Sequence, residues 1–255
     1  MRGMFQWTSP AAIALLASVV CCALPSAAAA EDAAIRVLIV TGMDHPAHNW
    51  RATTAALEKV LPEDPRVQIT LLTDPYQLDK ADLSKVNVLF LHFNNWQRPD
   101  PNDQAKANLR SFVERGGGLV LLHFACGAFP NWPEFPKLAG KVWDRKNGHD
   151  PRGPFRVELT DANHAITQGL KPFDTNDELY TCLTGQQPVE LLATARSKAT
   201  GTDQPMAFTL TYGKGRVFHT PLGHDAQAIE VPAVAELLRR GVAWTAGAEP
   251  LPSPK

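Results

Sequence analysis

From Ile35 onward the chain alternates short, almost continuously apolar stretches with longer segments of helical periodicity, and this alternation limits the possible folds. The predicted strands of the first half cover residues 35–42, 67–74, 86–93 and 118–124, and the predicted helices cover residues 49–61 and 103–116. Strands that are apolar on both faces are typical of a parallel sheet that helices cover on both sides, with right-handed crossovers. We therefore predict an α/β fold with a mostly parallel sheet between two layers of helices.

The second half of the chain has shorter predicted strands that are joined by turns. They cover residues 154–160, 189–195, 205–212 and 215–222, and a predicted helix follows over residues 231–247. Gly213 and Gly215 lie between the last two strands and predict a hairpin there. We find no internal repeat, so we predict one domain over residues 31–247 and a proline-rich tail over residues 248–255.

Residues 1–30 have the pattern of a signal peptide. Arg2 precedes an apolar run that ends at Leu24, and small residues with A-x-A spacing lie just before Ala30. The apolar run is shorter than the roughly 20 residues that a membrane-spanning helix needs. We therefore favour cleavage over a single-pass anchor, and we predict a periplasmic or secreted protein with no stable membrane insertion.

Cleavage would leave Cys126 and Cys182 as the cysteines of the mature chain. In an oxidising compartment the two thiols either form a disulfide or remain as two small buried side chains. The sequence does not choose between these alternatives, and it makes no prediction of the oligomeric state.

Charge and glycine content exclude two classes of binding protein. The formal net charge of −1 and the lack of a basic run argue against a nucleic-acid partner. Gly116–Gly118 follow a predicted helix and precede a predicted strand, whereas a phosphate-binding glycine loop follows a strand and opens a helix. We therefore predict neither a nucleic-acid partner nor a dinucleotide cofactor.

Polar side chains gather where the predicted parallel strands end, and six of the eight histidines are among them. The residues are Asp44, His45 and His48 after the first strand, His92, Asn94 and Asn95 after the third, His123 after the fourth, and His219, His224 and Asp225 after the last. Open parallel sheets bind ligands at the carboxyl ends of their strands. We predict that His48, His123 and His224 are catalytic, whereas strand alternation turns His92 into the core.

Six ordered segments carry a resemblance to a known family. They are TGMDHPAHNWRATT, HFNNWQRP, GGGLVLLHFACGAF, GHDPRGPF, DELYTC and YGKGRVFHTPLGHD. From about Ile35 to Ala246, the chain resembles the ThuA-like (trehalose utilisation) family of the class I glutamine amidotransferase-like superfamily. This resemblance implies a flavodoxin-like three-layer α/β sandwich. It also implies a role in the catabolism of trehalose and related disaccharides as 3-keto derivatives, without fixing the reaction.

A glutaminase would need a cysteine at the turn after the fourth strand, together with a histidine and a carboxylate. The residue at that turn is His123, and Cys126 lies three residues later. We therefore predict that glutaminase activity is lost. A carbonyl group makes a neighbouring C–H proton removable, so histidines at this edge could instead catalyse epimerisation, isomerisation or eliminative cleavage of an oxidised sugar.

The expected partner is a small-molecule carbohydrate. The predicted substrate-binding residues, aromatic or polar groups near the strand ends and in the DELYTC segment, are His45, Asn95, Trp96, Trp132, Asp177, Glu178 and Asp225. We predict an acid/base site without a metal or cofactor, and a divalent metal among His48, His123, His224 and Glu178 is the alternative. A second alternative is a carbohydrate-binding protein without catalytic activity.

Overall fold

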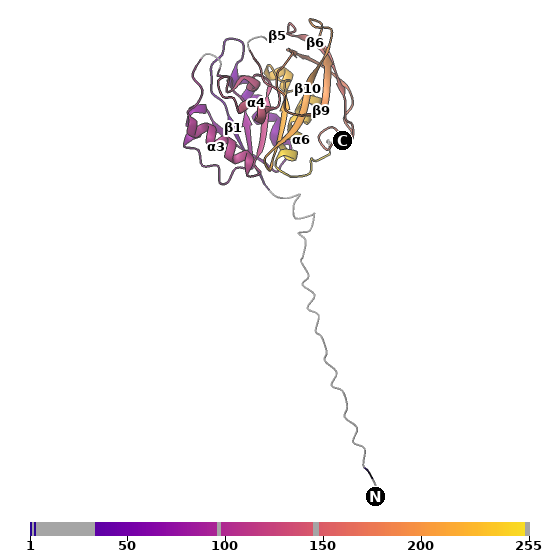
Figure 1. The fold of residues 1–255 in the computed structure, drawn as a ribbon. Coiled ribbons are helices and arrows are strands. Elements are labelled where there is room, and N and C mark those ends of the chain that lie inside the picture. The colour runs from indigo at the N-terminus through magenta and orange to yellow at the C-terminus, as the bar shows by residue number, and fades with distance from the viewer. Residues whose placement is uncertain (2, 4–33, 96–97, 145–147, 253–255) are drawn as a thin grey trace.

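The computed structural model describes residues 1, 3, 34–95, 98–144 and 148–252 (Figure 1). In this part of the chain, nine strands form one sheet in the order β2-β1-β3-β4-β11-β10-β9-β6-β7, and β5 and β8 form a separate two-stranded sheet. The strands are β1 Ile35–Val40, β2 Val67–Leu72, β3 Val88–Leu91, β4 Gly118–Leu122, β5 Gly148–His149, β6 Gly153–Leu159, β7 Phe173–Asp177, β8 Tyr180–Thr181, β9 Glu190–Arg196, β10 Asp203–Tyr212 and β11 Gly215–Thr220. The helices are α2 Trp50–Val60, α3 Asp103–Glu114, α4 Phe135–Ala139, α5 Ala226–Ile229 and α6 Pro232–Thr245, with short 3₁₀ helices η1 Leu61–Glu63, η2 Pro75–Asp79 and η3 His123–Gly127.

The large sheet has a parallel half and an antiparallel half. Strands β2, β1, β3, β4 and β11 pair in parallel, whereas β11, β10, β9, β6 and β7 pair antiparallel. The predicted hairpin joins β10 to β11, with Tyr212 opposite Gly215 and Gly213 at φ 59° in the turn. The prediction of an α/β fold is confirmed, and the predicted parallel pairing forms the half of the sheet from β2 to β11.

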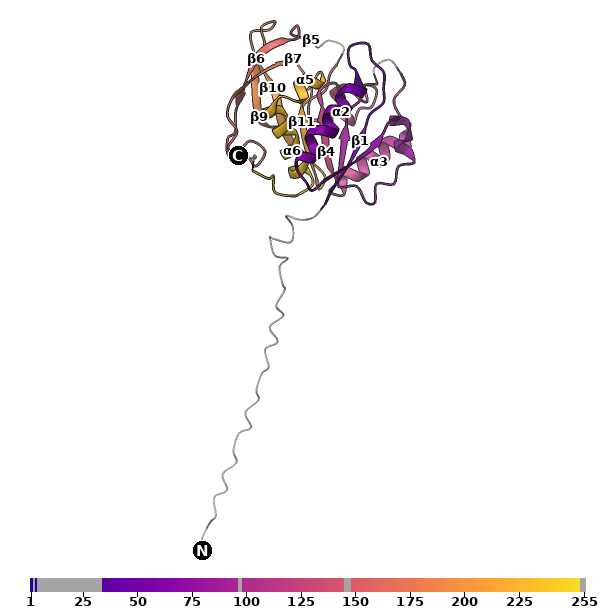
Figure 2. The same ribbon diagram turned by 180° about the vertical axis from the view of Figure 1, so that it is seen from behind.

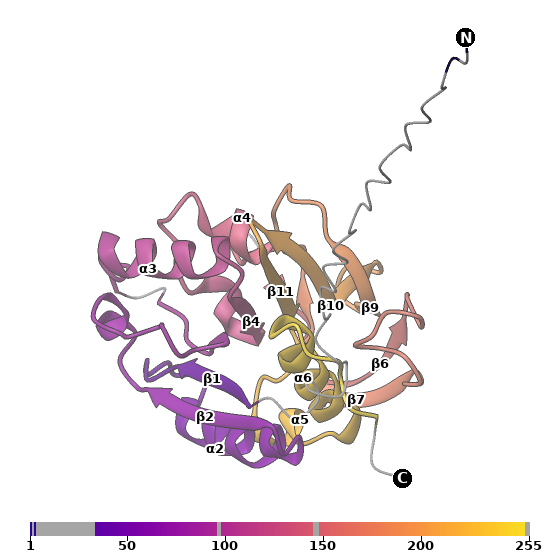
Figure 3. The same cartoon turned by 90° about the horizontal axis from the view of Figure 1, so that it is seen from below.

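Helices cover both faces of the sheet, as Figures 2 and 3 show. Ile39 of β1 packs in one core cluster with Leu57 of α2 and with residues of α5 and α6. The next residue, Val40, belongs to the opposite cluster, which includes Leu109 of α3 and Phe135 of α4. Because side chains alternate along a strand, β1 contributes to both cores, and the predicted three-layer arrangement follows.

The strand order reverses at β1, which lies between β2 and β3, and the loops that leave β1, β4 and β11 meet at this edge of the sheet. The chain turns sharply after β1 at Gly42, where φ is 106° and a Cβ would lie 1.7 Å from the carbonyl oxygen of Thr73. Only glycine fits such a position. This turn directs the following loop, which carries His45 and His48, over the carboxyl ends of the strands.

Some sequence predictions concern residues outside the described part of the chain. Almost all of the predicted signal peptide lies outside the described part of the chain. The predicted substrate-binding residue Trp96 also lies outside it. The described part of the proline-rich tail packs on the domain, where the Arg66 guanidinium donates to the carbonyl of Glu249. Among the described residues, no helix is both long and apolar enough to span a bilayer.

Candidate functional site

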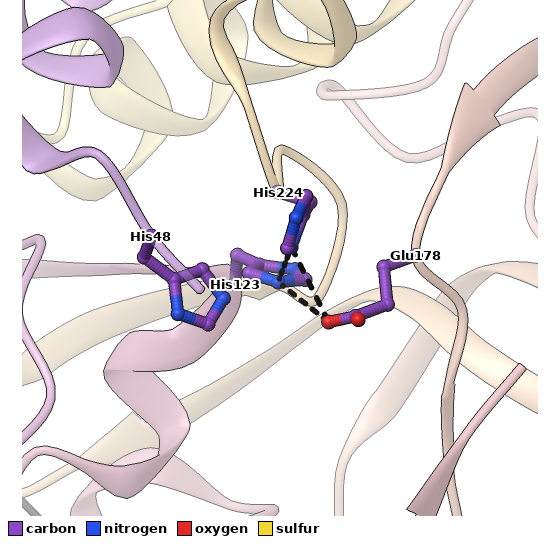
Figure 4. Close-up of side chains that lie close together, drawn as sticks. All are labelled: His48, His123, Glu178 and His224. Carbon is purple, nitrogen blue, oxygen red and sulfur yellow. Dashed lines mark hydrogen bonds and ion pairs between the residues drawn. The ribbon is translucent and has the colours of Figure 1, made fainter. Parts of the chain in front are cut away.

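Three histidines and a glutamate converge at the carboxyl ends of the strands (Figure 4). His48 follows β1, His123 follows β4, Glu178 follows β7 and His224 follows β11. Each offers one potential ligand atom, and these four atoms lie within 4.8 Å of one another. We call these four residues the histidine-glutamate cluster. The structure thus brings together the three predicted catalytic histidines and one predicted substrate-binding residue.

Three atoms of the cluster form a nearly equilateral triangle. His224 Nδ1 lies 3.2 Å from His123 Nε2 and 3.3 Å from Glu178 Oε2, and His123 Nε2 lies 3.5 Å from the same oxygen. The second oxygen of Glu178 lies 3.1 Å from Nδ1 of His149. Glu178 therefore directs one oxygen into the cluster and the other towards His149.

His123 occupies a strained turn that fixes the direction of its ring. Its φ is 47°, a left-handed conformation that is uncommon for residues other than glycine. Its Nδ1 lies 2.6 Å from the carbonyl oxygen of Pro221, which can only accept a hydrogen bond. His123 therefore carries a proton on Nδ1, and in its neutral form it presents the lone pair of Nε2 to the cluster.

The hydrogen bonds of His48 also assign its neutral tautomer. Its Nδ1 lies 3.1 Å from Nδ1 of His45, and that nitrogen of His45 accepts the backbone N–H of Ala47. His48 Nδ1 must therefore be the donor, which leaves a lone pair on Nε2. This Nε2 is buried and has no hydrogen-bond partner among the described residues. The ring stacks on Phe124 with centroids 4.5 Å apart, and Figure 4 shows one ring nitrogen pointing towards His123.

Asp177 holds the two segments that carry His224 and Glu178. Its carboxylate is fully buried and accepts the backbone N–H groups of Gly223 at 2.6 Å and His224 at 3.0 Å. It also accepts the backbone N–H of Glu178 at 2.8 Å. Asp177 is therefore a positioning residue, and it does not contact the cavity described below.

Burial and mutual contact separate the protonation states of the cluster. Burial lowers the pKa of His48 to about 2, with further lowering from the neighbouring histidines. Burial alone would raise the pKa of Glu178, but its close contacts with His123 and His224 outweigh burial and hold this pKa well below its usual value. The hydrogen bond to Glu178 raises the pKa of His224. Near neutral pH the cluster therefore contains a neutral imidazole, a carboxylate and the histidine that most readily holds a proton.

A cavity of about 270 Å³ opens beside the cluster. Its lining residues are His45, Ala47, His48, Asn94, Cys126, Trp143, His149, Glu178 and Tyr180. A second cavity of about 630 Å³ shares Asn94, Cys126 and Trp143 with the first and includes Trp132. The two cavities adjoin, and their aromatic walls resemble those of small-molecule sites.

The structure places the other predicted residues in several environments. His45 lines the cavity, whereas Asn95 is buried and binds the carbonyl of Pro99 away from it. Asp225 caps α5 and pairs with Arg152 at 2.6 Å. His92 is fully buried with Nδ1 3.2 Å from Thr41, so its predicted place in the core is confirmed.

Sequence reasoning missed three residues that surround the cluster. His149 contacts Glu178, Tyr180 packs on His123 with ring centroids 4.2 Å apart, and Trp143 lies 4.7 Å from Tyr180. All three lie in or beside the two short strands β5 and β8, which have no periodic pattern. The only available signal was their presence in or near the GHDPRGPF and DELYTC segments.

Cys126 lines both cavities, but it is a poor nucleophile. The side chain is 1% exposed, and burial raises the pKa of its thiol to about 12. The thiolate is the reactive form, so little of it exists at neutral pH. Cys126 is a free thiol, so it forms no disulfide with Cys182. The Cys182 side chain is exposed.

We expect iodoacetamide to leave Cys126 unmodified in the native protein and to modify it once urea exposes the thiol. Peptide mass spectrometry with and without urea measures both states. Cys126→Ala should retain most of the activity of the unsubstituted protein. Native modification of Cys126, with activity lost in parallel, would show that the thiol is reactive.

Comparisons with known proteins agree with this fold. The chain is similar to a ThuA-like protein of Parabacteroides merdae, with 26% identity, coverage of 87% of this chain and 94% of the other, and a TM-score of 0.78. A ThuA-like protein of Bacteroides uniformis is 23% identical over 86% and 96% of the two chains, with a TM-score of 0.67. A glutamine amidotransferase of Thermotoga maritima shares the fold at 11% identity over 82% and 98%, with a TM-score of 0.50. No match is found among curated proteins.

The family model for ThuA, described as trehalose utilisation, matches residues 36–245. This range contains all four residues of the histidine-glutamate cluster and every strand of the large sheet except the first residue of β1. The chain therefore belongs to the ThuA family.

Proposed function

We propose that this protein is an enzyme of disaccharide catabolism that uses the histidine-glutamate cluster for acid/base chemistry on 3-keto sugars. The observation that carries the proposal is the buried, unpartnered Nε2 of His48 beside the carboxylate of Glu178 and beside His224, whose pKa the hydrogen bond to Glu178 raises. The neutral His48 ring presents a free lone pair, and Glu178, which counteracts the lowering of the His48 pKa, would stabilise the imidazolium that forms when this lone pair takes a proton. Such an arrangement suits proton transfer better than binding alone.

The reaction begins with removal of a proton from the carbon next to the ketone. His48 Nε2 takes this proton, and the electron pair of the C–H bond moves to the ketone oxygen to form an enolate. His224, whose pKa is raised by Glu178, donates a hydrogen bond to that oxygen. The enolate then takes a proton back at carbon, or expels a glycosidic oxygen that leaves with a proton from the acid.

The cavity walls support a sugar ligand. Trp143 and Tyr180 line the cavity beside the cluster, and Trp132 lines the adjoining cavity. Aromatic faces pack against the C–H groups of a pyranose ring, while His45 and His149 offer hydrogen bonds to its hydroxyl groups. The two cavities together give room for more than one ring. Because no glutaminase nucleophile is available in Cys126, we propose that glutamine hydrolysis is absent.

Conversion of a substrate panel tests the proposed function. The mature protein is incubated with trehalose, related disaccharides and their 3-keto forms, and the products are identified by NMR and mass spectrometry. We expect conversion of at least one 3-keto disaccharide and none of glutamine. Binding without conversion across the panel would favour a non-catalytic carbohydrate-binding protein, for which the aromatic cavity walls are the supporting feature.

We further propose export through the signal peptide predicted at residues 1–30, which rests on the sequence pattern alone. The mature protein should then begin between Ala30 and Asp32 and occur in a soluble periplasmic fraction. Intact-mass measurement of the protein from fractionated cells decides this. A retained Met1, or a lipid attached to Cys21, would contradict the proposed location.

A further inference from the structure

The triangle formed by His123, His224 and Glu178 has the dimensions of a metal site. In a tetrahedral zinc site with metal-ligand bonds of about 2.0–2.2 Å, neighbouring ligand atoms are separated by about 3.3–3.6 Å. The three observed separations are 3.2, 3.3 and 3.5 Å. The three atoms therefore lie where three ligands of one ion would lie, without rearrangement of the loops.

The protons available to the triangle do not satisfy its lone pairs. The Nδ1–H of His123 donates a hydrogen bond to the carbonyl oxygen of Pro221, so its Nε2 faces the cluster as an acceptor. Glu178 Oε2, which lies next to this Nε2, is also an acceptor. Neutral His123 cannot donate to this carboxylate oxygen. His224 Nδ1 can supply one proton to one of these acceptors, which leaves an acceptor facing an acceptor. A cation at the centre of the triangle would satisfy all three atoms.

The contacts outside the triangle are those that orient metal ligands. A ligating histidine usually donates its other ring N–H to a backbone carbonyl or carboxylate, as His123 does to Pro221. The outer oxygen of Glu178 lies 3.1 Å from His149, and Asp177 holds the backbone of both Glu178 and His224. These contacts fix the three donor atoms without using their lone pairs.

We propose that His123 Nε2, His224 Nδ1 and Glu178 Oε2 bind one divalent transition-metal ion. Two imidazoles and one carboxylate form a donor set that suits zinc or a neighbouring transition metal better than Mg²⁺ or Ca²⁺, which prefer oxygen ligands. Three protein ligands leave a position open for a water or substrate oxygen, as in catalytic zinc sites. This proposal takes up the alternative that the sequence leaves beside a metal-free site, with His48 outside the ligand set.

His48 remains outside the proposed ligand set. Its ring offers an atom within 4.8 Å of the other three, but its Nε2 makes no hydrogen bond with any described residue. It therefore stays available as a base next to the open position. A bound metal would polarise the ketone oxygen in place of His224, because an Nδ1 that binds a metal has no proton to donate. The metal assignment itself stands on the geometry of the triangle and does not depend on the substrate.

Direct metal binding tests the proposal without any substrate. Protein purified without a histidine tag is stripped with a chelator and titrated with Zn²⁺ by calorimetry, and Co²⁺ absorption reports the coordination geometry. We expect one Zn²⁺ per chain for the unsubstituted protein, for His48→Ala and for the remote control His164→Ala. The affinity for Zn²⁺ should fall at least about 100-fold in Glu178→Gln and in His224→Ala. Loss of a group that only orients a ligand costs at most about 100-fold, so a ligand should cost at least this much.

Thermal unfolding separates loss of the site from loss of the fold. In the absence of metal, Glu178→Gln should unfold at nearly the temperature of the unsubstituted protein, and Zn²⁺ should raise that temperature only in variants that keep the triangle. The proposal is overturned if the folded, unsubstituted protein binds no stoichiometric Zn²⁺ or if Glu178→Gln binds it equally well. Loss of binding in His48→Ala would overturn the three-residue ligand set.

Discussion

The His48→Ala variant is expected to fold normally and to convert a 3-keto disaccharide about 10²–10⁴-fold more slowly than the unsubstituted protein, the usual contribution of a positioned general base. The ring contributes its Nε2 lone pair to the site, and it packs against Phe124 and the rings of the neighbouring histidines rather than in either hydrophobic core. Initial rates on the best substrate of the panel, measured by NMR, give this ratio. Binding of the same substrate should change far less.

His164→Ala is the matched control for this variant. The His164 side chain contacts Trp244, Glu190 and the backbone N–H of Ile166, away from the cluster. The same substitution at this position should leave turnover within a few-fold of that of the unsubstituted protein. If His48→Ala and His164→Ala convert substrate at similar rates, then His48 is not the base.

Asp177→Ala is expected to lower the free energy of unfolding by about 2–6 kcal/mol. The substitution leaves the buried backbone N–H of Gly223 and the partly buried N–H of His224 without their acceptor, and each such group costs about 1–3 kcal/mol. The loop after β11 would also lose its attachment to β7, so His224 would leave the cluster. Urea unfolding at neutral pH measures the change in stability, and Zn²⁺ titration measures the loss of the site.

Asp174→Ala provides the control on the same strand. The Asp174 side chain is 76% exposed, and its carboxylate pairs with Arg156 at the surface. Exposed ion pairs contribute at most about 1 kcal/mol, so this variant should unfold close to the unsubstituted protein. Equal destabilisation by the two substitutions would show that the buried contacts of Asp177 do not hold the loop.

The parallel half of the sheet was predictable because its strands are apolar throughout and its helices have clear periodicity. Continuous apolar strands bring their carboxyl ends to one edge, and this places His48, His123 and His224 together without any long-range information. His92 was also predictable, because alternation along β3 turns its side chain into the core.

The environment of Glu178 was not predictable in the same way. Glu178 follows β7, the last strand of the antiparallel half, and His149 lies in β5, which has two residues. Neither position follows from a period of apolar residues, because long-range pairing places both. The sequence also could not tell which of two adjacent asparagines reaches the cavity. Asn94 lines the cavity, whereas Asn95 donates a hydrogen bond to the carbonyl of Pro99 inside the protein.

Hydrogen exchange at carbon measures proton transfer by the cluster most directly. A 3-keto disaccharide is incubated in D₂O with the unsubstituted protein and with His48→Ala, and deuterium at the carbons next to the ketone is followed by NMR. We predict that the unsubstituted protein incorporates deuterium or forms a cleavage product well above the buffer rate, and that His48→Ala does neither. Bound substrate that keeps all of its C–H protons and remains intact would contradict acid/base catalysis at this site.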